Sequence, residues 1–252
     1  MENNEEIKEE YLDNGVPNQK TEKKKSKLWI ILLIVLLCVI GIIVYAKVSE
    51  DNCSDVSYYT PSGSNPSLLI DAKPIIYIYP ERQVELTVKL GKPENITCSY
   101  PKYENEWKVI ANPNGTLVDT KTGRSLYALY WEGIYNTEKD ITEGFVVKGE
   151  DTITFLEEKL EILGLNEREA EEFIVYWLPK LEANKYNYIR FATMEEINEA
   201  MPLELSSKPD TVIRVLMQFK GLDEYIEVPE QKLGTPTRDG FVVVEWGGTE
   251  LK

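Results

Sequence analysis

The feature that most constrains this chain is an uninterrupted apolar run from Leu28 to Ala46, 19 residues without a charged side chain. As an α-helix rising about 1.5 Å per residue, the run would be roughly 28 Å long, close to the hydrocarbon thickness of a bilayer. Trp29 and Tyr45 lie near its ends, where amphipathic rings prefer the headgroup level. The run therefore predicts a single transmembrane helix, with the lipid bilayer as its partner. It is too long for the apolar core of a cleaved signal peptide, and the 27 residues before it are too many and too acidic.

The lysines around this run predict its orientation. Five of them precede it, at positions 20, 23, 24, 25 and 27, whereas Lys47 alone follows closely and is succeeded by Glu50, Asp51 and Asp55. Lysine next to a membrane helix is retained on the cytoplasmic side, while nearby acids count for little. We therefore expect a protein of the plasma membrane with a cytoplasmic N-terminus and an extracytoplasmic C-terminal domain. A buried core helix, the other alternative, would rarely carry so many lysines on one flank.

Composition divides the remainder into segments. Residues 1–27 are polar and predict a disordered cytoplasmic tail, and residues 47–72 are rich in Ser, Pro, Gly and Asn and predict a stalk. Residues 73–252 have the pattern of a folded domain, with a possible division into a β subdomain (73–140) and an α/β subdomain (141–252). The chain should thus place one folded unit beyond the membrane.

Charge and residue usage exclude several classes of function. The chain has a net charge of −15, and because residues 1–27 hold seven acids and six lysines, residues 47–252 keep a net charge of −14. A domain this acidic is repelled by phosphate backbones, so we expect no nucleic-acid partner. Histidine is absent and there are three cysteines, which excludes Ser-His-Asp chemistry, imidazole zinc sites and four-thiolate zinc sites. We predict no metal site and no cofactor.

Hydrophobic patterning predicts an α+β domain. Its first half reads as an antiparallel β unit, because short β-branched, aromatic or alternating segments are separated by turns; the predicted strands are 74–79, 84–90, 96–100, 107–111, 116–118 and 126–131. Helices follow: one from Asp151 or Thr152 to about Leu163, one opened by Asn166, and a short one opened by Thr193. Strands return at 211–219 and 241–246, and we expect them to rejoin the sheet.

Two places pair an aromatic ring with a carboxylate before glycine. Trp131-Glu132-Gly133 and Glu245-Trp246-Gly247 each stand at the end of a predicted strand. Aromatic faces stack on sugar rings, and two adjacent carboxylates can act as acid and base in glycoside hydrolysis. Trp131 and Trp246 are therefore candidate ligand-binding residues, and Glu132 and Glu245 are weak catalytic candidates. The competing interpretation is that the tryptophans belong to the core and the glutamates face solvent.

Arginine and cysteine supply the remaining candidates. Arg190 and Arg214 lie inside apolar strand patterns, which indicates a structural ion pair with a carboxylate such as Glu132 or Glu245, or else a clamp for an anionic ligand group. Cys53 and Cys98 both lie beyond the membrane helix. They could form a disulfide that ties the stalk to the β unit, or remain two separate thiols.

Five short motifs carry a resemblance to a known group of proteins. They are KPIIYIYP at 73–80, YWEG at 130–133, VKGEDT at 147–152, FIVYWLP at 173–179 and VEWGG at 244–248. In this order they resemble uncharacterised bacterial envelope proteins that are anchored or secreted. The resemblance spans roughly residues 72–251, and it implies a bacterial source and an envelope location. No activity is attached to the group, so no catalytic residue follows from it.

The sequence favours a non-enzymatic recognition or scaffolding domain, tethered at the cell surface and binding an envelope polymer or protein. The anchor, the stalk and the missing histidine indicate this function. Two alternatives stay open. One is an envelope-glycan hydrolase that uses Glu132 and Glu245, and the other is a transmembrane sensor whose tail reports occupancy of the outer domain.

Overall fold

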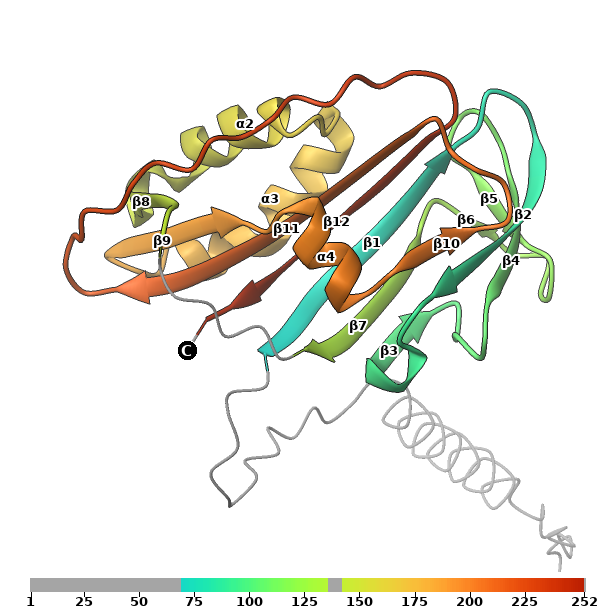
Figure 1. The fold of residues 1–252 in the computed structure, drawn as a ribbon, viewed down its shortest axis with the longest axis horizontal. Coiled ribbons are helices and arrows are strands. Elements are labelled where there is room, and N and C mark those ends of the chain that lie inside the picture. Colours follow the sequence, from blue (N-terminus) through green and yellow to red (C-terminus); the bar gives the residue numbers. More distant parts are fainter. Residues whose placement is uncertain (1–68, 136–141, 252) are drawn as a thin grey trace, which may run out of the picture. The chain divides into compact units, whose positions relative to one another are not determined.

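The computed structural model of the chain describes residues 69–135 and 142–251 (Figure 1). They form a β-rich α+β fold with three α-helices and two sheets. The helices are α2 (Thr152–Ile162), α3 (Glu167–Leu181) and α4 (Met194–Ala200). The strands are β1 (Leu69–Tyr79), β2 (Val84–Leu90), β3 (Ile96–Tyr100), β4 (Trp107–Ala111), β5 (Leu117–Asp119), β6 (Ser125–Leu126), β7 (Leu129–Tyr135), β8 (Phe145–Lys148), β9 (Tyr186–Phe191), β10 (Leu203–Leu205), β11 (Thr211–Leu222) and β12 (Val242–Glu250).

The larger sheet has seven strands in the order β3-β7-β1-β12-β11-β9-β8, and the smaller has five in the order β10-β2-β4-β5-β6. All neighbours are antiparallel except β11 and β12, which run parallel. Strands of the first half of the domain contribute to both sheets. The larger sheet joins strands from either side of residue 140, so the possible division there does not separate one sheet from the other.

Two hydrophobic cores lie on opposite faces of the larger sheet. In Figure 1, α2 and α3 cover one face, and α4 and the smaller sheet lie on the other. The helix-side core includes Leu156, Phe173 and Trp246, and the core between the sheets includes Leu86, Trp131 and Val243. Because both of its faces are covered, β12 is buried at every position from Val242 to Thr249 and does not alternate with polar residues.

Local signals set the helix ends. Both predicted capping boxes are confirmed: the side chain of Asn166 accepts from the amide of Glu169, and that of Thr193 accepts from the amide of Glu196. Gly164 follows α2 with a φ of +87°, a left-handed conformation that favours glycine and ends a helix. Asp151 occupies the N-cap position of α2, but its side chain makes no capping hydrogen bond.

The membrane predictions fall outside the described residues. These are the tail (1–27), the Leu28–Ala46 helix, the stalk up to residue 68, and Cys53. Across 69–135 and 142–251, no helix combines the length and the apolar character needed to cross a membrane.

Candidate functional site

Glu245 lies in a buried ion pair. It stands directly opposite Arg214 in the parallel register of β11 and β12, and both residues are less than one-tenth exposed. The Nε of Arg214 lies 2.6 Å from Oε2 of Glu245, and the indole Nε1 of Trp131 donates to Oε1 at 2.9 Å. The carboxylate is therefore enclosed by two donors and has little access to solvent.

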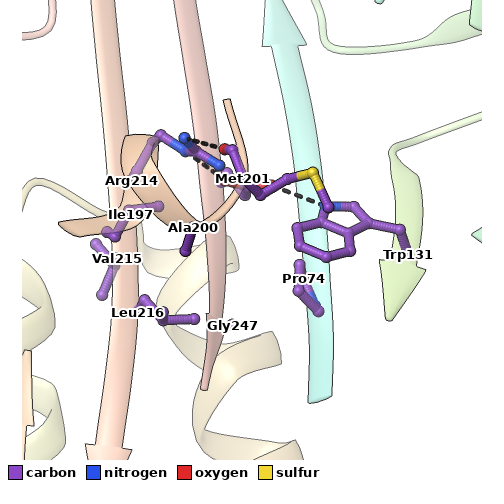
Figure 2. Close-up of a pocket in the computed structure, with 10 residues that line it drawn as sticks. Pro74, Trp131, Ile197, Ala200, Met201, Arg214, Val215, Leu216 and Gly247 are labelled. Carbon is purple, nitrogen blue, oxygen red and sulfur yellow. Dashed lines mark hydrogen bonds and ion pairs between the residues drawn. The ribbon is translucent and has the colours of Figure 1, made fainter. Parts of the chain in front are cut away.

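Arg214 also fixes the end of α4. Its Nη1 donates to Oδ1 of Asn198 at 2.7 Å and to the carbonyl of Met201 at 2.9 Å. Figure 2 shows the guanidinium beside Met201 at the edge of a small cavity that reaches Trp131 and Pro74. The cavity measures about 10 Å³, which is room for about one water molecule and not for an organic ligand.

Glu132 lies on the other face of the sheet. Side chains alternate along β7, so Trp131 points into the core between the sheets while Tyr130 and Glu132 point to the helix side. Glu245 shares the face of Trp131, to which it is hydrogen-bonded. The two candidate carboxylates are thus separated by the sheet and cannot act together on one glycosidic bond.

The two candidate tryptophans are core residues in this structure. Trp246 is fully buried, and its ring lies 5.3 Å from that of Phe173 in an edge-on arrangement. Trp131 is 2% exposed. Neither ring offers a face to a ligand.

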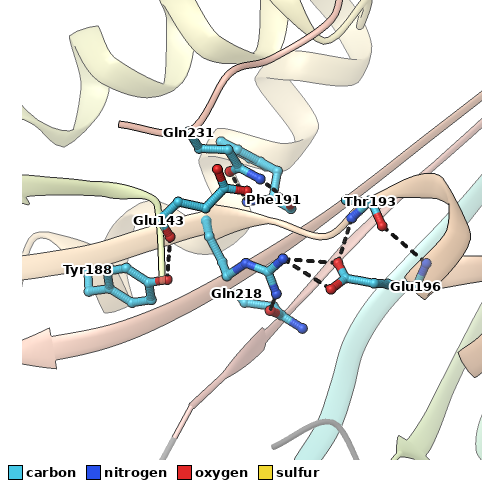
Figure 3. A network of polar contacts seen from close by, with 8 residues as sticks. Glu143, Tyr188, Phe191, Thr193, Glu196, Gln218 and Gln231 are labelled. Atoms are coloured by element: carbon cyan, nitrogen blue, oxygen red, sulfur yellow. Dashed lines mark hydrogen bonds and ion pairs between the residues drawn. The ribbon is translucent and has the colours of Figure 1, made fainter. Parts of the chain in front are cut away.

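Arg190 has a different set of partners from Arg214. Its Nη2 lies 3.0 Å from Oε2 of Glu196, and its Nη1 donates to Oε1 of Gln218 at 2.7 Å. Glu196 also accepts from the amide of Thr193 (Figure 3). The arginine therefore joins β9 and β11 to the first turn of α4. Arg190 is 7% exposed, and these contacts make it a structural ion pair rather than an open anion clamp.

A group of six tyrosines on the helix-side face was not singled out from the sequence. We define it as the tyrosine face; its members are Tyr77, Tyr79, Tyr100, Tyr127, Tyr130 and Tyr176. The rings of Tyr77 and Tyr79 are parallel with centroids 6.3 Å apart, and the ring of Tyr127 lies 6.3 Å from that of Tyr77. Tyr100 and Tyr130 stand directly opposite each other on β3 and β7. Tyr100 and Tyr127 are half exposed, at 51% and 50%.

Charged side chains contact the rings and hydroxyls of the tyrosine face. The hydroxyl of Tyr77 donates to Oε2 of Glu172 at 2.7 Å, and Oε1 of the same carboxylate accepts from Arg168. Arg168 also lies over the ring of Tyr127, with 5.0 Å from Cζ to the centroid. Lys73 lies 4.6 Å from the ring centroid of Tyr176. These contacts hold the rings in fixed orientations.

Burial and carboxylates perturb the ionisation of this face. Burial and a hydrogen bond with Glu132 raise the pKa of Tyr130. Burial and the hydrogen bond with Glu172 raise the pKa of Tyr77, and burial also raises that of Tyr127. Partial burial lowers the pKa of Lys73, which Glu172 opposes. The phenols therefore remain protonated hydrogen-bond donors at neutral pH.

Sequence reasoning missed this face because its members come from β1, β3, β7, the segment before β7, and α3. Tyr77 and Tyr79 alternate along one strand and so share a face, which is the one local signal available. The placement of Tyr100 beside Tyr130 depends on the pairing of β3 with β7.

Two predictions concern sulfur and metals. Cys98 is disulfide-bonded; its partner is not among the described residues, so the pairing with Cys53 stays a prediction. Across 69–135 and 142–251, no three Cys, Asp or Glu side chains gather as a metal site would require.

Comparison with known proteins finds no matching family model, no similar curated protein and no similar solved structure.

Proposed function

We propose that the chain is a single-pass membrane protein that displays a recognition domain outside the cytoplasmic membrane and binds a component of the cell envelope. The apolar run Leu28–Ala46 and the lysines before it support the anchoring and the orientation. The resemblance to bacterial envelope proteins supports the location. The tyrosine face supports the binding role.

The observation that carries the proposal is the half exposure of Tyr100 and Tyr127 beside a set of fixed rings. Tyrosine supplies a large, rigid contact area with a polar tip at a low cost in side-chain entropy, and it is enriched at binding surfaces for that reason. The hydrolase alternative lacks comparable support, since Glu132 and Glu245 lie on opposite faces of the larger sheet.

Photo-crosslinking in intact cells tests this function. Benzoylphenylalanine placed at position 127 should form adducts of high molecular mass on irradiation, because the ring belongs to the binding face. Position 225 is the matched control, since Tyr225 is 61% exposed and lies outside the tyrosine face. Adducts at position 127 and not at 225 are the expected result. Absence of adducts at 127, or equal yields at both positions, would refute the proposed function.

A further inference from the structure

Lys73 has a strained backbone at the border of the tyrosine face. Its φ is +58°, and across 69–135 and 142–251 every other positive φ belongs to a glycine. Side chains disfavour this left-handed conformation, and the residue before a proline, here Pro74, is pushed toward extended backbone. A glycine would adopt this φ without strain.

The strain coincides with an irregularity on both sides of β1. The register with β12 shifts between Ala72 and Ile75, and the register with β7 shifts between Asp71 and Ile75. Strained residues of this kind persist where the surrounding structure enforces them, and they concentrate at ligand sites. A lysine at a position that suits glycine therefore indicates a use for its side chain.

That side chain places a cation among aromatic rings. The Nζ of Lys73 lies 4.6 Å from the ring centroid of Tyr176 on α3 and 5.5 Å from that of Trp246 on β12. Lys180 approaches the same Tyr176 ring, with its Nζ 5.3 Å from the centroid. Within the described part of the chain, neither ammonium group makes an ion pair or donates a hydrogen bond.

The nearby carboxylates already have other donors. Glu172 accepts from the hydroxyl of Tyr77 and from Arg168, and Glu132 is hydrogen-bonded to Tyr130. Partial burial lowers the pKa of Lys73 by more than the charge of Glu172 raises it. The positive charge of Lys73 is thus incompletely compensated by these side chains.

We infer that Lys73 binds a carboxylate group of the ligand, with Lys180 as a second cation beside the same ring. This inference rests on the proposed recognition function and names the chemistry of one ligand group. An ammonium group and a carboxylate form a strong, charge-assisted hydrogen bond. A single carboxylate fits better than a polyanion, because Glu132, Glu172 and the net charge of −14 over residues 47–252 repel multiple negative charges.

Saturation-transfer NMR on the full chain in lipid nanodiscs tests the inference, with acetate as the probe and acetamide as its neutral analogue. At constant ionic strength, the acetate methyl should receive about threefold or more of the magnetisation that the acetamide methyl receives. Lys73→Gly should reduce the acetate signal to the acetamide level. Lys73→Arg, which keeps the charge, and Lys208→Gly, an exposed control, should retain it.

Competition identifies the source of the carboxylate. Displacement of acetate by N-acetylalanine indicates the end of a peptide chain, and displacement by glucuronate indicates an acidic sugar. Failure of both compounds to displace acetate would overturn the inference.

Thermal unfolding separates a lysine retained for a ligand from one that the fold requires. Lys73→Gly relieves the backbone strain and should melt no lower than the wild type, whereas Lys73→Ala keeps the strain and should melt below Lys73→Gly. Circular dichroism follows the unfolding and shows that each variant is folded at the temperature of the NMR experiment.

Three further results would overturn the inference. They are equal signals from acetate and acetamide, an acetate signal that persists in Lys73→Gly, and a Lys73→Gly variant that melts below Lys73→Ala. The crosslinking experiment separates these failures from failure of the proposed function. Adducts at position 127 and not at 225 would leave the recognition function standing and remove only the carboxylate site.

Discussion

At the scale of single residues, the buried pair Arg214–Glu245 connects three elements, β11, β12 and α4. The two side chains are almost completely buried, and Arg214 connects β12 to the C-terminal end of α4 through Glu245, Asn198 and Met201. A buried ion pair contributes little beyond what a well-packed apolar pair would give, but removing one partner leaves an uncompensated charge.

Replacement of that arginine should therefore be costly. Arg214→Met is expected to lower the free energy of unfolding by about 3–5 kcal/mol. The double variant Arg214→Met/Glu245→Leu should recover part of this loss, because no charge is left buried. Denaturant unfolding of the full chain in detergent provides the measurement. Arg82→Met is the control, since Arg82 is exposed and its loss should cost within about 0.5 kcal/mol. A loss in Arg214→Met no larger than this control would contradict the assignment.

The phenols of the tyrosine face predict sensitivity to alkali. The pKa values of Tyr77 and Tyr130 are raised, first by burial and then by hydrogen bonds to carboxylates, so the folded state retains protons that the unfolded state loses above about pH 10. The stabilisation is complete below pH 10 and declines as the pH rises further. Lys73, whose pKa is lowered, has the opposite sign.

Thermal unfolding at several pH values between 9 and 11, followed by circular dichroism, measures this decline. Tyr77→Phe removes one raised phenol and should make the decline shallower. Tyr225→Phe, in an exposed position, should leave the slope unchanged. A wild-type stability that is constant across this range would contradict the burial of these phenols.

At the scale of elements, the start of α3 is fixed by a buried carboxylate. Glu169 has no exposed surface, accepts from the amide of Asn166 at 2.9 Å, and binds Arg238 with two contacts of 2.8 and 3.1 Å. Arg238 belongs to the long connection between β11 and β12 and also donates to the carbonyl of Gly164. One side chain therefore caps the helix and attaches that connection to it.

Glu169→Ala should lower the free energy of unfolding by about 3 kcal/mol, because it removes a cap and leaves a partly buried arginine unpaired. Glu171→Ala on the same helix is the matched control, since Glu171 is exposed and its removal should cost within about 0.5 kcal/mol. Urea unfolding curves of the two variants are compared. Equal midpoints would show that Glu169 has no special role.

Local sequence patterns predicted the bounds of strands better than they predicted which strands pair with one another. The strands 84–90, 96–100 and 107–111 are observed with the predicted bounds, because alternation and turn residues are short-range signals. The single strand predicted at 126–131 is wrong. The chain there forms β6 of the smaller sheet and β7 of the larger one, with Tyr127 and Ala128 between them. Which sheet a short strand joins depends on distant partners that no local pattern contains.

The candidate site likewise has one part that short-range sequence signals indicated and another part that depends on strand pairing. The ion pair between Arg214 and Glu245 was among the alternatives from sequence, because a strand arginine in an apolar pattern needs a carboxylate. The opposite-face placement of Glu132 could not be predicted without the order of β7, β1 and β12. The tyrosine face depends on that same order.

At the scale of the whole molecule, β1 connects the predicted stalk to the centre of the larger sheet. It pairs with β7 on one side and with β12, near the C-terminus, on the other. Sequence reasoning expected the late strands to rejoin the sheet, and they do so beside the first strand. If the proposed stalk tethers the domain, a strand paired on both sides is well suited to this role, because two ladders of hydrogen bonds would resist a pull on it.

The proposed function depends on the orientation of the chain across the membrane. It is tested most directly by labelling intact cells with a membrane-impermeant maleimide. Two variants are compared, Tyr225→Cys in the acidic domain and Asn3→Cys in the tail, with the wild-type chain as the background for its own cysteines. We expect Tyr225→Cys to be labelled in intact cells and Asn3→Cys to be labelled only after lysis. Labelling of Asn3→Cys in intact cells, with Tyr225→Cys protected until lysis, would contradict it.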